Sequence, residues 1–289
     1  MNYLRKLFFA ILLSISLLAS PIIIPHRGGT GEMPENTIFS YEKSVTLGLN
    51  ILEIDVQVTK DDQIVLYHPR NLEVSTNGNG LINDYVLKDI KKLDAAYKFK
   101  VDEEYLYRNK GLTIPTLRET LNKFPKTTFI IDMKSLPSDK LVKALISTIK
   151  TSEWKRLIFY STNSEHINLL KSLAPQAITF EERNKTRERL LNILLDNNDL
   201  KDINSDWIGF DYNRKMTIGE EFALGTDSND FIIYPWNEKT VSALKKLNPN
   251  VKIVVFGVET IEDYNKMDEL GIYAIYTNFP NKLKSALKN

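Results

Sequence analysis

Two carboxylates stand two positions apart in the apolar run Ile51–Val58. If this run is a strand, Glu53 and Asp55 point to the same face, about 7 Å apart along the chain. A cation, protonation or water must offset their repulsion, and two hard oxygen ligands facing one space favour Mg²⁺ or Ca²⁺ over zinc. The alternative interpretation is the outward polar face of an edge strand.

A third carboxylate and a cation follow another apolar run. Asp132 and Lys134 come after Thr127–Ile131, and the two-residue period of a strand places them on one face. They would add a metal ligand and a compact cation for an anionic substrate. An ordinary surface ion pair is the alternative.

Few positions could supply a catalytic histidine, because the 289-residue chain contains three histidines. It contains no cysteine. His26 and Arg27 follow an apolar run and precede two glycines. This pattern suits phosphate, since arginine binds paired oxygens and glycine lets the backbone approach closely; a solvent-facing strand exit is the alternative. His68 ends a second apolar run and alone would be more often structural than catalytic. His166, at a predicted helix start, is interpreted as a surface residue.

Together these motifs predict two histidines, three carboxylates, an arginine and a lysine at successive strand ends. The combination suits metal-assisted attack on a phosphodiester, in which the cations hold the non-bridging oxygens, one histidine takes a proton and the other gives one.

The amino-acid composition excludes several other classes of protein. With 38 basic and 37 acidic residues the net charge is +1, which provides no basic field for nucleic acid. The lack of cysteine excludes a disulfide scaffold, a thiolate zinc site and an iron–sulfur cluster.

The elements that must position these groups alternate between short β-rich runs and segments with helical spacing. Strands are predicted at Pro21–Pro25, Ile51–Val58, Ile64–Tyr67, Thr127–Ile131, Arg156–Tyr160, Ala177–Phe180, Trp207–Phe210, Lys252–Phe256 and Tyr273–Tyr276. Helices are predicted at Asn36–Leu47, Leu117–Lys123, Asp139–Lys150, Ser164–Leu173, Thr186–Leu195, Lys239–Leu247 and Ile261–Leu270. This alternation predicts an α/β fold, a (βα)₈ TIM barrel over residues 21–289.

One connection is too short for a crossover helix, which needs about ten or more residues. Residues 59–62 therefore predict a tight turn, and the resulting hairpin delivers His68 beside Glu53. The polar stretch after the third strand, residues 69–114, is predicted to be a small cap insertion over one end of the barrel. The aromatic residues of this segment either favour a lipid substrate or form the cap's own core. They are Tyr85, Tyr97, Phe99, Tyr105 and Tyr107.

Residues 1–20 are interpreted as a targeting segment. Arg5 and Lys6 precede an apolar run from Leu7 to Leu18, which is the layout of a secretory signal peptide. The cleavage region is imperfect, and counted through to Ile24 the run approaches the length that crosses a bilayer, so an uncleaved N-terminal membrane anchor is the alternative. The protein is therefore expected to be exported, either periplasmic or secreted, or to be associated with a membrane.

The motifs, taken in order, resemble those of the glycerophosphodiester phosphodiesterase family. The matching segments are His26-Arg27-Gly28, Pro34-Glu35-Asn36-Thr37, Gly48…Glu53-x-Asp55, Thr59-x-Asp61, Val65…His68, Ile114-Pro115-Thr116-Leu117 and Gly271…Tyr276-Thr277-Asn278-x-Pro280. The likeness runs from Ile22 to the C-terminus and is thinner between roughly 135 and 250. It implies a TIM barrel that binds one divalent cation, Mg²⁺ or Ca²⁺. The residues to which it gives roles are His26 and His68 as the acid/base pair, Glu53, Asp55 and Asp132 as metal ligands, and Arg27 and Lys134 on the phosphate.

The reaction that the resemblance implies is hydrolysis of a small glycerophosphodiester to glycerol 3-phosphate and an alcohol, with water or a neighbouring glycerol hydroxyl attacking phosphorus. Three residues depart from the family pattern: Pro69 replaces Asp, Asp132 replaces Glu and Phe256 replaces Trp. The segment from His26 to Glu32 resembles a branch that acts on lysophospholipids. A lysophospholipase D releasing lysophosphatidic acid is therefore the main alternative, and a non-catalytic phosphodiester-binding barrel is a lesser one.

Overall fold

A computed structural model describes residues 20–288 apart from 103, 198–199, 201 and 223–224. The predicted signal peptide or membrane anchor therefore lies, except for Ser20, outside the described residues, and export or membrane association stays a prediction. Among the residues that are described, no helix combines the length and the apolar character needed to span a bilayer.

Eight parallel strands form the wall of a (βα)₈ TIM barrel, which confirms the predicted fold class. They are β1 (Ile22–Pro25), β2 (Ile51–Val58), β4 (Thr128–Met133), β5 (Leu157–Tyr160), β6 (Ile178–Thr179), β7 (Trp207–Asp211), β10 (Lys252–Phe256) and β11 (Ala274–Thr277). Parallel pairing joins β1, β11, β10 and β7 in one arc and β2, β4, β5 and β6 in the other. A bridge between Phe180 and Trp207 links the arcs at one seam, and β1 packs beside β2 at the other.

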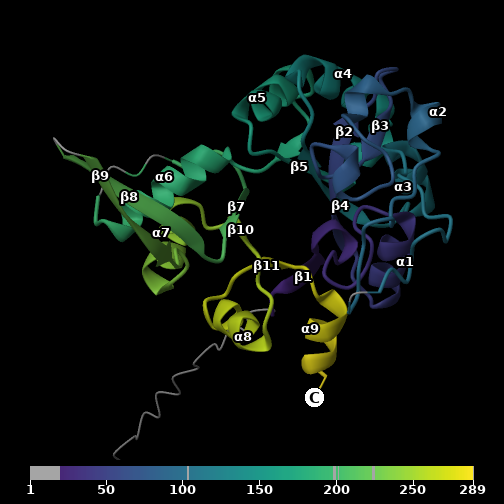
Figure 1. The fold of residues 1–289 in the computed structure, drawn as a ribbon. Coiled ribbons are helices and arrows are strands. Elements are labelled where there is room, and N and C mark those ends of the chain that lie inside the picture. Colours follow the sequence, from purple (N-terminus) through teal and green to yellow (C-terminus); the bar gives the residue numbers. More distant parts are fainter. Residues whose placement is uncertain (1–19, 103, 198–199, 201, 223–224, 289) are drawn as a thin grey trace, which may run out of the picture.

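A helix follows each barrel strand and lies outside the ring of strands (Figure 1). The helices are α1 (Ile38–Thr46), α3 (Leu117–Lys123), α4 (Ser138–Thr148), α5 (Ser164–Leu173), α6 (Arg183–Leu194), α7 (Glu238–Leu247), α8 (Ile261–Glu269) and α9 (Pro280–Ala286). The start of α3 shows how local sequence fixes these bounds. The Thr116 hydroxyl accepts a hydrogen bond from Glu119 N, and the Glu119 carboxylate accepts one from Thr116 N, so the capping box begins the helix there.

Successive strand residues alternate between the barrel interior and the layer beneath the helices. On β2, Leu52, Ile54 and Val56 pack against the outer helices, so Glu53 and Asp55 point into the barrel. Both carboxylates are almost fully buried. The alternative of an outward polar face is therefore wrong for this pair.

The short connection after β2 is a hairpin, as predicted. β3 (Ile64–Leu66) pairs antiparallel with β2, with Leu66 opposite Val56, and Thr59 N donates to Gln63 O across the turn at 2.9 Å. Beyond β3 the chain runs back along β2, where Tyr67 N donates to Asp55 O at 3.1 Å. The hairpin thus carries His68 towards the carboxylates.

In residues 69–114, leaving aside position 103, the helical structure consists of short turns at Leu72–Val74, Ile82–Asp84 and α2 (Leu87–Ile90). Their apolar side chains form a separate small core with Val65 and Tyr67. The five aromatic side chains of this segment are engaged within it or on α1. Tyr85 packs against the small core, Tyr97 and Tyr105 flank Arg108, and Phe99 and Tyr107 form a cluster with Phe39 of α1. These contacts favour the reading in which they form the cap's own core.

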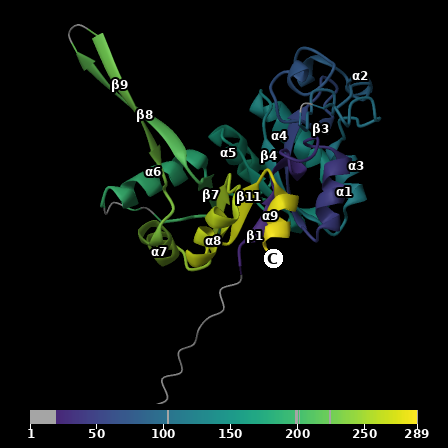
Figure 2. The same ribbon diagram turned by 60° about the horizontal axis from the view of Figure 1, so that its bottom comes forward.

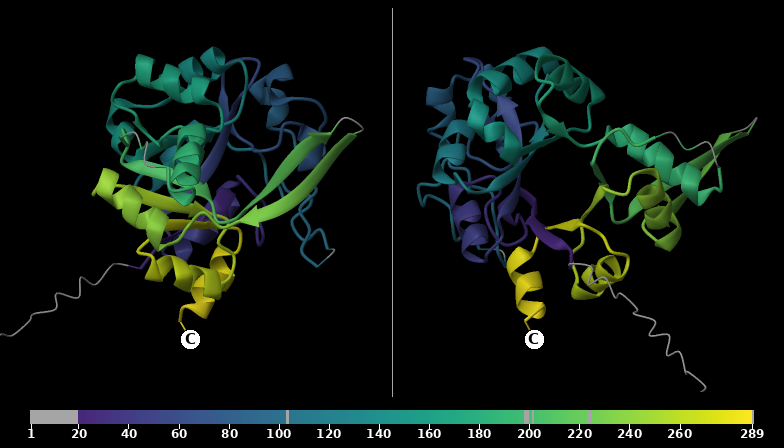
Figure 3. Two further views of the ribbon diagram at one scale, coloured as in Figure 1. Left: turned by 90° about the vertical axis from the view of Figure 1, so that its left-hand side faces the viewer. Right: turned by 180° about the vertical axis from the view of Figure 1, so that it is seen from behind.

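One element is absent from the sequence prediction. Between β7 and α7 the chain forms a long antiparallel hairpin of β8 (Arg214–Phe222) and β9 (Gly225–Ile233). The hairpin extends away from the body of the protein, on the other side of the barrel from α2 and towards the same end (Figures 2 and 3).

The two ends of the barrel differ in what they carry. The predicted site residues lie at the carboxyl ends of the strands, where TIM barrels place their active sites. The described chain begins at the other end (Figure 2). There the Tyr264 hydroxyl donates to Pro21 O at 3.0 Å, and the Ser20 hydroxyl donates to Asp268 at 3.3 Å.

Candidate active site

Three buried carboxylates from neighbouring strands converge inside the barrel. Asp55 on β2 lies opposite Asp132 on β4 in the parallel register, and Glu53 shares the inner face of β2. One oxygen from each carboxylate lies within 4.8 Å of the other two. The structure therefore brings all three predicted metal ligands together, even though Asp132 has the short side chain.

The pKa values of these carboxyl groups are pulled apart by burial and by neighbouring charges. Burial raises the pKa of Glu53 well above its usual value, and the charges of Asp55 and Asp132 add to the rise. Burial also raises the pKa of Asp132 to about 6, against the opposing effect of Lys134. For Asp55, burial acts upward too, but Lys134 and Arg27 outweigh it and hold the pKa below its usual range. Like charges forced together in this way create a strong local demand for a cation.

The donor atoms fit a hard divalent cation. Asp55 Oδ1 and Asp132 Oδ1 are buried and accept no hydrogen bond from the described residues, so each keeps lone pairs for a ligand. Carboxylate oxygens are the ligands that Mg²⁺ and Ca²⁺ prefer. Within the described chain, this is the one cluster of three His, Cys or acidic side chains close enough to share a metal ion.

Both predicted phosphate-binding cations border the carboxylates. Lys134 Nζ lies 2.6 Å from Asp132 Oδ2 and 3.4 Å from Asp55 Oδ1. Arg27 Nη1 donates to Glu35 Oε2 at 2.9 Å, and Arg27 Nε lies 3.3 Å from Asp55 Oδ2. Both cations keep part of their side chain exposed, which leaves room for an anion to reach them.

Residues of the segment Pro34-Glu35-Asn36-Thr37 hold the side chains of this site in place. The sequence motif alone does not reveal this role. Glu35 holds Arg27, as described above. Asn36 Nδ2 donates to Asp55 Oδ2 at 2.9 Å, and Asn36 Oδ1 accepts from Asp55 N at 3.0 Å. The Thr37 side chain caps α1 by accepting from Ser40 N. Glu35 and Asn36 therefore orient side chains of the site, and Thr37 starts the helix that follows.

His26 is held by Asn278, the residue that directly follows the last barrel strand, β11. The Nδ1 atom of His26 lies 2.8 Å from Asn278 Oδ1, so Nδ1 carries the proton and Nε2 keeps its lone pair. Glu259 in turn accepts hydrogen bonds from Asn278 N and the Thr277 hydroxyl, both at 2.9 Å. Burial lowers the pKa of His26 to about 4, with Arg27 adding to the shift. The imidazole is therefore neutral at neutral pH.

His68 lies close to the same charges but is not bound in the same way. Burial lowers its pKa, against the opposing charge of Asp55. No hydrogen bond to its ring comes from the residues that the structure describes. Gln57 Nε2 donates to the carbonyls of Tyr67 and Pro69, at 3.0 and 2.7 Å. Pro69 is thus part of a backbone turn that Gln57 fixes around His68.

His166 is buried, so its interpretation as a surface residue is wrong. It is 1% exposed, and its ring bridges the Ser161 hydroxyl and Ser135 O, both at 2.9 Å. The ring therefore ties the start of α5 to the loop that follows Lys134. The helical spacing from Ile167 to Leu170 was the available signal, since it places His166 on the edge of the buried face.

Gly28 allows the turn that presents His26 and Arg27. Its φ is +85°, and a Cβ atom there would lie 2.4 Å from the Ser40 hydroxyl oxygen. Gly28→Ala is therefore expected to lower the free energy of unfolding by about 2 kcal/mol or more. Urea unfolding would measure it, with Gly48→Ala as a control for positive φ without a clash, since nothing lies within 4 Å of its Cβ position. An equal loss in both variants would contradict the steric part of this argument.

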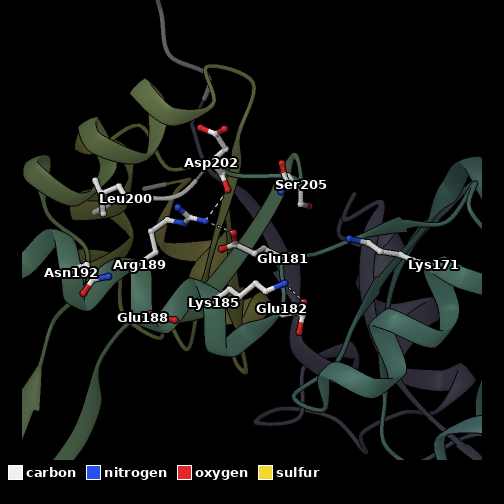
Figure 4. Close-up of a pocket in the computed structure, with 11 residues that line it drawn as sticks. Lys171, Glu181, Glu182, Lys185, Glu188, Arg189, Asn192, Leu200, Asp202 and Ser205 are labelled. Carbon is white, nitrogen blue, oxygen red and sulfur yellow. Dashed lines mark hydrogen bonds and ion pairs between the residues drawn. The ribbon is translucent and has the colours of Figure 1, made fainter. Parts of the chain in front are cut away.

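A separate hollow of about 330 Å³ lies beside α6. The side chains around it are mostly charged, and none of the predicted site residues is among them (Figure 4). Arg189 Nη2 and Glu181 Oε1 form a buried ion pair there at 2.7 Å, and the Thr186 hydroxyl donates to Glu181 Oε2 at 2.9 Å. These contacts fix α6 to the end of β6, so the paired charges have a structural role.

Comparison with known proteins points to one family. The profile of the glycerophosphoryl diester phosphodiesterase family matches residues 26–282. The uncharacterized protein Rv2277c of Mycobacterium tuberculosis is 31% identical over 265 residues, which are 90% of this chain and 87% of that protein. A glycerophosphodiester phosphodiesterase of Bacillus subtilis is 40% identical over 121 residues, 39% of this chain and 40% of its own. A lysophospholipase D of Rattus norvegicus is 26% identical over 92% of this chain and 86% of its own.

Solved structures agree. The crystal structure of the glycerophosphoryl diester phosphodiesterase domain of Rv2277c superposes with a TM-score of 0.84 at 29% identity, and covers 93% of this chain and 99% of that one. A phosphodiesterase of Oleispira antarctica in complex with the product sn-glycerol-3-phosphate has the same fold, with a TM-score of 0.69 at 22% identity over 93% of this chain and 98% of that one.

Proposed function

Because this chain belongs to the glycerophosphoryl diester phosphodiesterase family and is a phosphoric diester hydrolase, we propose that it hydrolyses glycerophosphodiesters to glycerol 3-phosphate and an alcohol. The observation that carries this proposal is the convergence of three carboxylates, two cations and two histidines at the carboxyl ends of β1, β2 and β4. The product complex of the Oleispira antarctica phosphodiesterase, whose fold is the same, supports the identity of the product.

Glu53, Asp55 and Asp132 would hold a divalent cation, Mg²⁺ or Ca²⁺, which when bound neutralises their charge and polarises a phosphoryl oxygen. Arg27 and Lys134 bind the remaining non-bridging oxygens, because both are partly exposed cations beside the carboxylates.

The two histidines divide the proton transfers. His26 Nε2, with its lone pair free, takes the proton from the attacking oxygen, which is water or a neighbouring glycerol hydroxyl. A bond forms from that oxygen to phosphorus, and the bond from phosphorus to the leaving alcohol oxygen breaks. His68 gives a proton to the leaving alcohol oxygen. Where a glycerol hydroxyl attacks, the product of this step is a cyclic phosphate, and water opens it to glycerol 3-phosphate in a second displacement with the roles of the two histidines reversed. The anionic substrate favours the protonated form of His68 as it binds beside the ring. Asn278 is a positioning residue, since it sets the tautomer of His26.

The proposal is tested with the purified protein, Mg²⁺ or Ca²⁺, and glycerophosphocholine. Release of glycerol 3-phosphate and choline in equal amounts is expected. The rat relative supports a second candidate, a lysophospholipase D, which would release choline from lysophosphatidylcholine instead. Choline from lysophosphatidylcholine alone would replace the first proposal by the second. Saturable glycerol 3-phosphate binding with no turnover of either substrate would instead favour the non-catalytic barrel.

A further inference from the structure

Two tyrosine hydroxyls inside the barrel lack an acceptor for their proton. The hydroxyl of Tyr276 is buried and makes no hydrogen bond with any described residue. The hydroxyl of Tyr160 accepts from Arg183 Nη1 at 2.8 Å, and within the described chain its own proton has no acceptor. Buried polar groups are normally satisfied. Phenylalanine would fill the same space without this cost, so the hydroxyls require another explanation.

Both tyrosines face the candidate site. Tyr160 lies opposite Asp132 in the register of β4 and β5, and its side chain belongs to the interior cluster. Tyr276 belongs to the same cluster, and its ring stacks on Phe256 at 4.6 Å and on His26 at 6.0 Å between centroids. β5 and β11 lie two strands from β2, on either side of it. The Phe256 ring contacts both phenols, with its centroid 5.4 Å from that of Tyr160 and 4.6 Å from that of Tyr276.

Neither tyrosine gives up its proton at working pH. Burial raises the pKa of Tyr160 to about 12, and burial with the charges of Glu53 and Asp132 raises the pKa of Tyr276 well above its usual value. Arg183 is fixed in turn by Asp211, with Nη2 2.7 Å from Oδ2. The site thus holds two neutral donors among aromatic rings.

We propose that the hydroxyls of Tyr276 and Tyr160 donate hydrogen bonds to the hydroxyl oxygens of the glycerol arm of the substrate, and so select for that arm. Charge complementarity supports this division of the site. The anionic phosphoryl oxygens are matched by the cations Arg27 and Lys134, whereas neutral phenols beside Phe256 suit a neutral, carbon-bearing hydroxyl. Arg183 is the positioning residue for Tyr160. This inference rests on the proposed function and assigns its substrate selectivity to two residues.

The test compares two ligands that differ only in hydroxyl groups. With Mg²⁺ present, calorimetry measures the affinities of sn-glycerol 3-phosphate and of propyl phosphate, which has the same phosphate and carbon chain without hydroxyls. We expect the wild type to prefer glycerol 3-phosphate, and Tyr276→Phe and Tyr160→Phe each to reduce that preference by about tenfold, since each removes one hydrogen bond to the ligand. The affinity for propyl phosphate should stay unchanged.

Tyr273→Phe is the matched control. It removes a hydroxyl from the residue that directly precedes β11, and Tyr273 lies at the opposite end of the barrel, beside Trp207. It should leave the preference intact. The Tm of Tyr276→Phe should equal or exceed that of the wild type, because the change removes a buried hydroxyl without a partner. An unchanged preference in both Phe variants of a folded protein would overturn the inference.

Turnover separates this inference from the function on which it rests. If the wild type hydrolyses glycerophosphocholine and the Phe variants keep its preference, only the role of the tyrosines is wrong. If the wild type hydrolyses no glycerophosphodiester, the proposed function fails and the inference fails with it. For the active enzyme, the ratio of kcat/KM for glycerophosphocholine to that for propylphosphocholine should fall in the same variants, by the same factor as the binding preference.

Discussion

Replacement of either histidine of the proposed acid–base pair, as His26→Ala or His68→Ala, should lower kcat for glycerophosphocholine by about 10²- to 10⁴-fold, the range typical of general acid–base groups. The charge of Asp55 acts on both rings. No described residue forms a hydrogen bond to the His68 ring, whereas Asn278 accepts one from His26. The variants should therefore keep the fold and the affinity for the metal. Steady-state release of glycerol 3-phosphate measures the loss.

His166→Ala provides the control that the chain itself offers, since it removes the third and last histidine. His166 bridges Ser161 and Ser135 and is buried. Its replacement should lower the free energy of unfolding by about 1–3 kcal/mol, while the folded fraction keeps kcat within a few-fold. A variant of His26 or His68 with wild-type kcat would remove that residue from the proposed proton transfers.

Removal of the divalent cation with EDTA should abolish turnover, and Glu53→Gln should produce the same loss without EDTA. Gln keeps the shape of the side chain and an acceptor for Arg27 N, which donates to Glu53 Oε2 at 2.7 Å. It removes one of three crowded negative charges. The apo protein should therefore be no less stable than the wild-type apo protein, because burial and two like charges already disfavour ionised Glu53.

The readout besides activity is thermal unfolding with and without metal. A cation at a hundredfold excess over its Kd stabilises the folded state by about 2.7 kcal/mol, which in a domain of this size is a rise in Tm of several degrees. Glu53→Gln should lose most of that rise. Glu42→Gln, which changes an exposed carboxylate paired with Lys123, should keep it. An undiminished rise in Glu53→Gln would exclude Glu53 as a ligand.

Much of the barrel could be predicted because its strands carry a purely local signal. The runs Ile51–Val58 and Lys252–Phe256 have the same bounds in the sequence prediction and in the structure. The first alternates apolar and polar residues with the two-residue period of a strand, and the second has consecutive apolar residues, as a strand covered on both faces does. The approach of His68 to the carboxylates also followed from local information, because a tight turn fixes the register of the two strands that it joins.

The remaining features depend on contacts that local pattern does not encode. Asn278 contacts His26 although 252 positions separate them in the sequence. Tyr276 stands out because its hydroxyl has no hydrogen-bond partner among the described residues, and no spacing rule reveals either feature. The hairpin of β8 and β9 was missed for a different reason. Its one strong apolar run, Phe231–Tyr234, continues into Pro235 without clear alternation, and so lacks the period that identifies a strand.

The contact between Pro21 and Tyr264 at the amino end of β1 gives the molecule an orientation. The described chain begins at the amino ends of the barrel strands, and the three carboxylates lie towards the carboxyl ends. If the chain is attached to a surface directly before Ser20, the end of the barrel that carries the carboxylates faces away from that surface. The height of the barrel then separates the site from the surface. Substrates dissolved in the surrounding medium would enter directly, whereas a lipid would first have to leave its bilayer and travel around the protein. A tether at the amino ends of the barrel strands therefore suits a scavenger of soluble diesters better than an enzyme that works on the membrane beneath it.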